Sequence, residues 1–151
     1  MSPPPTTERF GRYRLITELG SGGMSKVHLA VAESGPQIGR KLVVLKLLQE
    51  HLQADADFTK LFVREARIAV EMSHSNVVHT HTVGEQDGRN YILMEYLEGV
   101  SLRTIMKASA DWSLRDRLPL FGGICMALTG LHYVHEFHAH RGTHLDLVHR
   151  D

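Results

Sequence analysis

The chain lacks the features that would mark a secreted, membrane-spanning or nucleic-acid-binding protein. Its 151 residues include one cysteine, Cys125, so no disulfide can form within the chain, and a reducing cytoplasm is the expected location. Its 17 basic residues balance 17 acidic ones, which gives nucleic acid no electrostatic attraction. No run approaches the roughly 18 consecutive apolar residues of a spanning helix, so we expect no membrane segment.

What the sequence contains is typical of a globular domain, with 42% hydrophobic and 23% charged residues. The start is rich in proline and threonine and has no basic segment followed by an apolar one, so we expect no signal peptide there. We expect residues 1–12 to form a disordered leader.

Short alternating apolar runs after residue 12 predict an antiparallel sheet of five strands. Three runs, at 13–19, 27–32 and 41–48, are joined by turn-rich stretches, and two more, at 77–84 and 91–96, flank the hairpin signal Asp87-Gly88. Apolar residues at helical spacing predict a helix over 55–72, capped by Asp55. Two further helices are predicted over 101–109, capped by Ser101, and over 113–136.

A glycine-rich turn separates the first two predicted strands. Gly20 and Gly22 are followed by Ser25 and Val27. Glycines let a backbone turn sharply and bring its N–H groups close to phosphate oxygens. A dinucleotide-binding turn of the Rossmann type needs a helix directly afterwards, whereas a strand follows here. Considered alone, the turn is equally compatible with a plain hairpin.

Lys46 lies among apolar residues in the third predicted strand, and Glu65 lies on the helix that follows. An ion pair between them would hold the ammonium group in place for phosphate binding. Glu71 is the rival acid, but six positions along a helix rotate it well off the face of Glu65. The plain alternative is a solvated lysine on an edge strand.

Seven segments in this order resemble protein kinases, specifically the eukaryotic-like Ser/Thr kinases of bacteria. They are the glycine-rich turn at 20–27, Lys46, Glu65, and the segments 74–78, 94–99, 131–135 and 149–151, the last reading His-Arg-Asp. The resemblance covers residues 13–151. It implies an α+β, kinase-like fold, with a complete N-lobe over 13–96 (five-stranded antiparallel sheet plus helix C). The hinge and the first helices of an incomplete C-lobe would follow over 97–151.

The resemblance also implies roles for individual residues. The implied catalytic set is Lys46, Glu65 and Asp151, with Asp151 as the base that orients the substrate hydroxyl. Glu65 is favoured over Glu71 because the family places this acid in the middle of the helix. The implied nucleotide-binding set is Leu19, Gly20, Gly22, Ser25, Val27, Val44, Lys46, Met94, Glu95 and Leu97. Within that set, Ser25 replaces the third glycine of the family pattern, and Val44 replaces an alanine and narrows the adenine slot.

The implied activity is transfer of the ATP γ-phosphate to a protein hydroxyl, with ATP and Mg²⁺ as cofactors of the complete kinase. The family's metal ligands would follow Asp151, so no metal residue is assigned and we expect the 151-residue chain alone to be inactive.

Two alternatives remain open. The first is a truncated pseudokinase or nucleotide-binding interaction module, in which the apolar stripe of the helix at 113–136 mediates self-association or docks a partner. The second is a metal-binding protein, because five histidines cluster between 132 and 144, although no HExxH or Cys-x-x-Cys motif is present.

Overall fold

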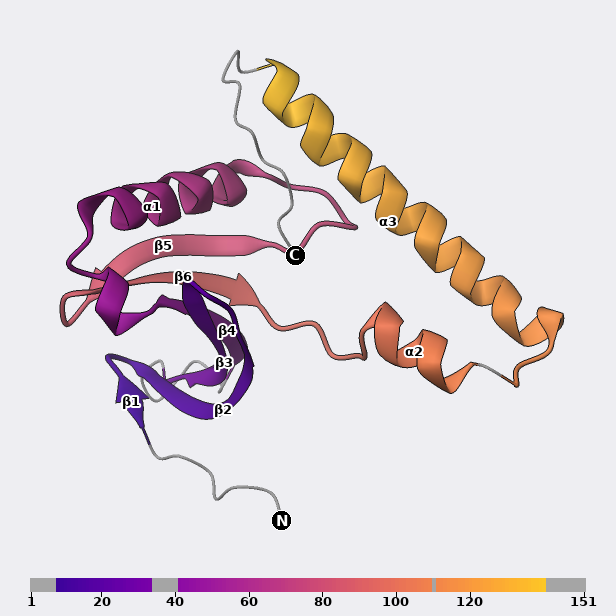
Figure 1. The fold of residues 1–151 in the computed structure, drawn as a ribbon, viewed down its shortest axis with the longest axis horizontal. Helices are drawn as coiled ribbons and strands as arrows, with labels where there is room; N and C mark the ends of the chain where they lie inside the picture. Colours follow the sequence, from indigo (N-terminus) through magenta and orange to yellow (C-terminus); the bar gives the residue numbers. More distant parts are fainter. Residues whose placement is uncertain (1–7, 34–40, 110, 141–151) are drawn as a thin grey trace. The chain divides into compact units, whose positions relative to one another are not determined.

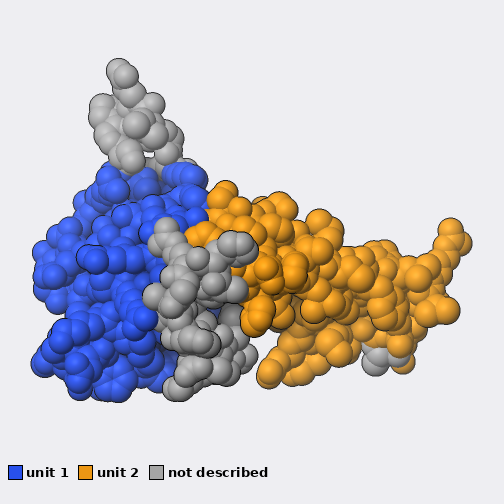
Figure 2. Space-filling view, turned by 90° about the horizontal axis from the view of Figure 1, so that it is seen from above, with its two compact units in different colours: residues 1–71, 78–97 blue, residues 72–77, 98–151 orange. Residues whose placement is uncertain are grey.

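The computed structural model describes residues 8–33, 41–109 and 111–140. Two compact units divide the chain (Figure 2). The first comprises residues 1–71 and 78–97, and the second comprises 72–77 and 98–151. The sheet and the first long helix belong to the first unit, and the remaining helices belong to the second.

The first unit is a six-stranded antiparallel sheet with one helix packed on it (Figure 1). The sheet order is β1-β2-β3-β4-β6-β5, and α1 packs against β5 and β6. The strands are β1 (Arg9–Phe10), β2 (Tyr13–Ser21), β3 (Ser25–Ala32), β4 (Lys41–Leu48), β5 (Thr80–Gln86) and β6 (Arg89–Glu95), and a 3₁₀ turn η1 (Glu50–Leu52) precedes α1 (Ala56–Glu71). The kinase-like α+β architecture and the five predicted strands are confirmed.

The sixth strand, β1, corrects the expectation that residues 1–12 are a disordered leader. Arg9–Phe10 pairs with the start of β2, and Phe10 is only 5% exposed, with its ring centroid 5.5 Å from that of Tyr91. Gly11 reverses the chain with a φ of 55°, which suits glycine. Two residues are too few for an alternating pattern, so periodicity could not reveal β1. Residues 1–7 of the expected leader lie outside the described residues.

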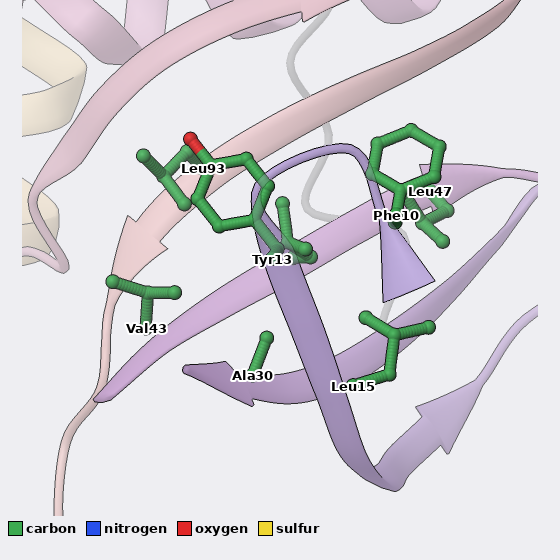
Figure 3. Close-up of a cluster of buried hydrophobic side chains, with 8 residues drawn as sticks. Phe10, Tyr13, Leu15, Ala30, Val43, Leu47 and Leu93 are labelled. Atoms are coloured by element: carbon green, nitrogen blue, oxygen red, sulfur yellow. The ribbon is translucent and has the colours of Figure 1, made fainter. Parts of the chain in front are cut away.

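The two faces of the sheet bury two different clusters, because side chains alternate along each strand. One face carries the larger cluster (Figure 3), formed by Phe10, Tyr13, Leu15, Ala30, Val43, Leu45, Leu47 and Leu93. On the other face, Leu48 and Ile92 pack against Phe62 and Ala66 of α1. Asp55 starts this helix as predicted, since its Oδ1 accepts the backbone N–H of Asp57 at 2.9 Å.

The second unit contains α2 (Leu102–Ala108) and α3 (Leu114–His140). Ser101 caps α2 as predicted, because its hydroxyl accepts the N–H of Thr104 at 3.3 Å. Helix α3 extends past the predicted end at 136, so residues 137–140 are helical where a loop was expected. The sequence there offers neither glycine nor proline to stop a helix. The rest of the expected loop lies outside the described residues.

Within the second unit, residues 72–77 pack closely against α3. The Tyr133 hydroxyl accepts the N–H of Ser73 at 3.1 Å, and the Tyr133 ring stacks on His74 at 4.9 Å between centroids. A Cβ added to Gly130 would lie 2.6 Å from the carbonyl oxygen of Asn76. The close approach therefore requires glycine at position 130.

Helix α3 carries large apolar side chains in contact with solvent. Phe121, Leu128 and Leu131 are each more than half exposed. By length and composition alone, Leu114–Phe137 would also be able to cross a membrane, and it is the one such helix among the described residues. Core helices of soluble domains have the same composition, so this test does not distinguish the two cases.

Candidate nucleotide-binding site

Strand register aligns the glycine-rich turn with the predicted lysine in the first unit. Gly20 lies opposite Val27, Val27 lies opposite Lys46, and Lys46 lies opposite Ile92. Directly opposed residues of antiparallel strands present their side chains on the same face. Because Ile92 packs on α1, this row lies on the helix-bearing face of the sheet.

The neighbouring row supplies apolar residues to the same face. Val44 lies opposite Leu29 and opposite Met94. Val44 is buried, and Met94 packs against the cluster that contains Phe62 of α1. Val44 and Met94 of the predicted nucleotide-binding set therefore lie one register row from Lys46, whereas Val27 lies in the same row as Lys46.

The glycine-rich turn joins β2 to β3 and leaves open space above its glycines. A Cβ added to Gly20 or Gly23 would meet nothing within 4 Å, and at Gly22 only the Ser25 carbonyl oxygen would come as close as 4.0 Å. None of the three has a positive φ. Neither packing within the described chain nor backbone strain requires glycine at these positions. Close approach of another molecule would require it.

Ser25, at the third glycine position of the family pattern, is 8% exposed and opens β3. Its carbonyl oxygen accepts the N–H of Gly22 at 2.9 Å and so closes the turn. Leu19 lies at a register shift in β2 and is half exposed. The bulge takes Leu19 out of the ladder immediately before the turn.

Lys46 and Glu65 are not joined in this structure. Lys46 is half-buried and Glu65 is exposed, and no ion pair among the described residues connects the two. Helix geometry nevertheless favours Glu65 over its rival. At about 100° per residue, Glu65 lies roughly 60° from the buried Phe62, whereas Glu71 lies roughly opposite it. Glu65 thus borders the face of α1 that packs on the sheet.

Glu95, a residue of the predicted nucleotide-binding set, ends β6 shortly before the predicted hinge. The N–H of Glu95 donates to the His79 carbonyl oxygen at 3.0 Å, and Glu95 Oε1 accepts the His79 N–H at 2.7 Å. The Glu95 side chain therefore anchors the end of β6 to the segment before β5. Leu97, two residues on, is 63% exposed. His79 belongs to no motif, so the sequence alone could not reveal this contact.

Burial and nearby charge lower the pKa of His81, which lies on β5 next to His79. Burial lowers its pKa most, followed by the positive charge of Lys41 and by His79, and Glu95 opposes the shift. The His79 and His81 rings meet edge to face, with centroids 4.9 Å apart. The environment therefore favours the neutral form of His81.

Two of the sites predicted from the sequence fall partly or wholly outside what the structure describes. Asp151, the predicted base, lies beyond the described residues, as does His144 of the histidine cluster considered for metal binding. In the described part of the chain, no group of three or more metal-ligating side chains is close enough to hold a metal ion.

Comparison with known proteins assigns the family. A family model described as protein tyrosine and serine/threonine kinase matches residues 13–151. The chain therefore belongs to the protein kinase family, and the resemblance to bacterial eukaryotic-like kinases is confirmed.

Named relatives and solved structures agree with this assignment. The chain is 34% identical to the tyrosine-protein kinase MasK of Myxococcus xanthus, covering 100% of this chain and 25% of MasK. It is 33% identical to the serine/threonine-protein kinase PrkC of Bacillus subtilis, covering 93% of this chain and 19% of PrkC. A crystal structure of the Mycobacterium tuberculosis PknI kinase domain matches with a TM-score of 0.59 and 26% identity, covering 90% of this chain and 53% of that domain. The chain thus spans a quarter or less of these two curated relatives and about half of a solved kinase domain.

Proposed function

We propose that this chain is the ATP-binding part of a Ser/Thr protein kinase that transfers the ATP γ-phosphate to a protein hydroxyl. One observation carries the proposal: the glycine-rich turn, Val27 and Lys46 share a register row, and the turn leaves open space where phosphates would lie. Phosphoryl transfer depends mainly on positioning the phosphates and on neutralising their charge. In this row, the turn would position the phosphates and the Lys46 ammonium group would neutralise charge.

Each part of the nucleotide has a matching surface in this proposal. The turn's backbone N–H groups and the Lys46 ammonium group would hold the phosphates. Val27, Val44 and Met94 would contact the adenine, whose edge would pair with the backbone of Glu95 and Leu97. In the complete kinase, Mg²⁺ would neutralise charge that develops on the phosphates, and Asp151 would orient the substrate hydroxyl.

Catalysis in this proposal also needs Glu65 to pair with Lys46. Glu65 borders the sheet-facing side of α1, so a rotation or shift of that helix would bring its carboxylate toward the lysine. The structure then corresponds to a form in which the catalytic pair is open. Closing this pair would fix the ammonium group for phosphate binding.

The test of this function is the affinity of the 151-residue chain for ATP, measured by isothermal titration. Replacing Lys46 with Met keeps the apolar stem and removes the charge. A hydrogen bond to a charged group contributes about 1.5–3 kcal/mol, so we expect about a tenfold to hundredfold loss of affinity. The matched control is Lys60→Met on α1, where the lysine is 78% exposed. Absence of ATP binding, or equal affinities for the two variants, would contradict the proposal.

The acceptor residue is the finer part of the proposal. PrkC is named a serine/threonine kinase and MasK a tyrosine kinase, and the two are almost equally similar to this chain. We favour Ser/Thr from the motifs of the small lobe, with a protein substrate in the cytoplasm. Phosphoamino-acid analysis of substrate labelled by the full-length protein tests this preference, and phosphotyrosine alone would overturn it.

A further inference from the structure

Gln49 links the glycine-rich turn to the strand that carries Lys46. Its side-chain Nε2 donates a hydrogen bond to the carbonyl oxygen of Gly22 at 2.5 Å. Its backbone N–H donates to the carbonyl oxygen of Met24 at 3.0 Å. Gln49 directly follows β4 and lies three residues after Lys46, so one residue ties two points of the turn to this strand.

The side chain of Gln49 serves the turn and not its own helix. Gln49 occupies the N-cap position of η1, yet its side chain makes no capping hydrogen bond. Gln53, at the other end of η1, behaves differently. Its amide donates to the Leu48 carbonyl oxygen at 2.8 Å and accepts the Asn90 N–H at 3.3 Å, so it joins η1 to the sheet.

Holding a carbonyl group in place also sets the direction of an N–H group. A trans peptide unit is planar, so the N–H of Gly23 points opposite to the Gly22 carbonyl oxygen. The bond from Gln49 to that oxygen therefore orients the Gly23 N–H group. The bond to Met24 orients the N–H of Ser25 in the same way. Both groups belong to the turn that is proposed to cover the phosphates.

We propose that Gln49 is a positioning residue for nucleotide phosphates. It holds the glycine-rich turn in register with Lys46, so that the turn's N–H groups and the ammonium group bind the same phosphate chain together. This inference rests on the proposed ATP-binding function and adds to it the residue that couples the two phosphate-binding elements. Gln49 belongs to none of the kinase motifs in the sequence.

The test compares Gln49→Met with Gln53→Met in the 151-residue chain. Methionine has nearly the length of glutamine but cannot donate a hydrogen bond. Affinities for ATP and for adenosine are measured by isothermal titration, with melting temperatures as a check on folding. Adenosine reports on the base and ribose contacts, whereas ATP also reports on the phosphate contacts.

We expect Gln49→Met to weaken ATP binding by about threefold to tenfold, the effect of one neutral hydrogen bond, and to leave adenosine binding unchanged. Gln53→Met should lower the melting temperature and leave the ratio of ATP to adenosine affinity as in the wild type. An unchanged ratio in Gln49→Met, with ATP binding intact in the wild type, would overturn this inference alone. A parallel loss of both affinities would show a merely structural role. A wild-type chain that binds no ATP would overturn the proposed function as well.

Discussion

At the scale of single residues, Gly130 and Gly20 differ in their physical reason to be glycine. Gly130 is required by packing, since a Cβ there would collide with the backbone of Asn76. A Cβ on Gly20 would meet nothing within 4 Å and its φ is not positive, so its own chain does not require glycine there. A glycine that folding does not require is a candidate for a role in function.

This contrast predicts opposite outcomes for two alanine variants. Gly20→Ala should leave the free energy of unfolding unchanged or raise it by up to about 1 kcal/mol, because alanine restricts the unfolded chain. It should nevertheless weaken ATP binding, because the added methyl group occupies space proposed for phosphate. Gly130→Ala should lower the free energy of unfolding by about 1–3 kcal/mol, the usual cost of overpacking. Urea denaturation and ATP titration of both variants check this, and a destabilised Gly20→Ala would refute it.

At the scale of elements, local chemistry made most boundaries predictable. The strand at 41–48 matches β4 residue for residue, and the helix capped by Asp55 lies within one residue of α1 at each end. The Asp87-Gly88 hairpin forms with positive φ at both positions, 53° and 73°. The sequence did not reveal Gln49, because its role depends on a contact 27 residues away that leaves no local pattern. The connecting turns predicted the antiparallel pairing of these strands, but not the register that places Gly20 and Lys46 in one row on either side of Val27.

His81, near the start of β5, should make the free energy of unfolding depend on pH. The pKa of folded His81 lies below the ordinary value of 6.5, mainly because of burial. As the pH falls below about 6.5, the unfolded chain therefore takes up a proton before the folded chain does. The His81 contribution to the free energy of unfolding is fully present above that pH and decreases below it.

The expected result is a wild-type urea midpoint that decreases between pH 7.5 and pH 5.5, and a smaller decrease in His81→Gln. His28 on β3 has its pKa lowered with burial as the first cause, so the His28→Gln, His81→Gln double variant should show a smaller decrease still. Urea denaturation at the two pH values measures this. An identical decrease in wild type and both variants would show that other groups carry the pH dependence.

At the scale of the whole molecule, the chain buries its sheet well and α3 poorly. The first unit has two buried clusters, whereas α3 keeps Phe121 and Leu128 more than half exposed. This chain covers only about half of the similar PknI kinase domain. In the described part of this chain, nothing packs over these two side chains. An apolar face of this kind favours association with another molecule.

We therefore expect the 151-residue chain to self-associate as its concentration rises, with apparent masses above the monomer mass of 17.0 kDa. The double variant Phe121→Gln, Leu128→Gln should shift the chain toward the monomer without loss of folding, because both side chains are already in solvent. The matched control is Leu42→Gln, a similarly exposed apolar residue on β4. Sedimentation velocity at several concentrations measures the shift. A chain that stays monomeric throughout, or a control that dissociates the assembly equally well, would show that the α3 face does not drive association.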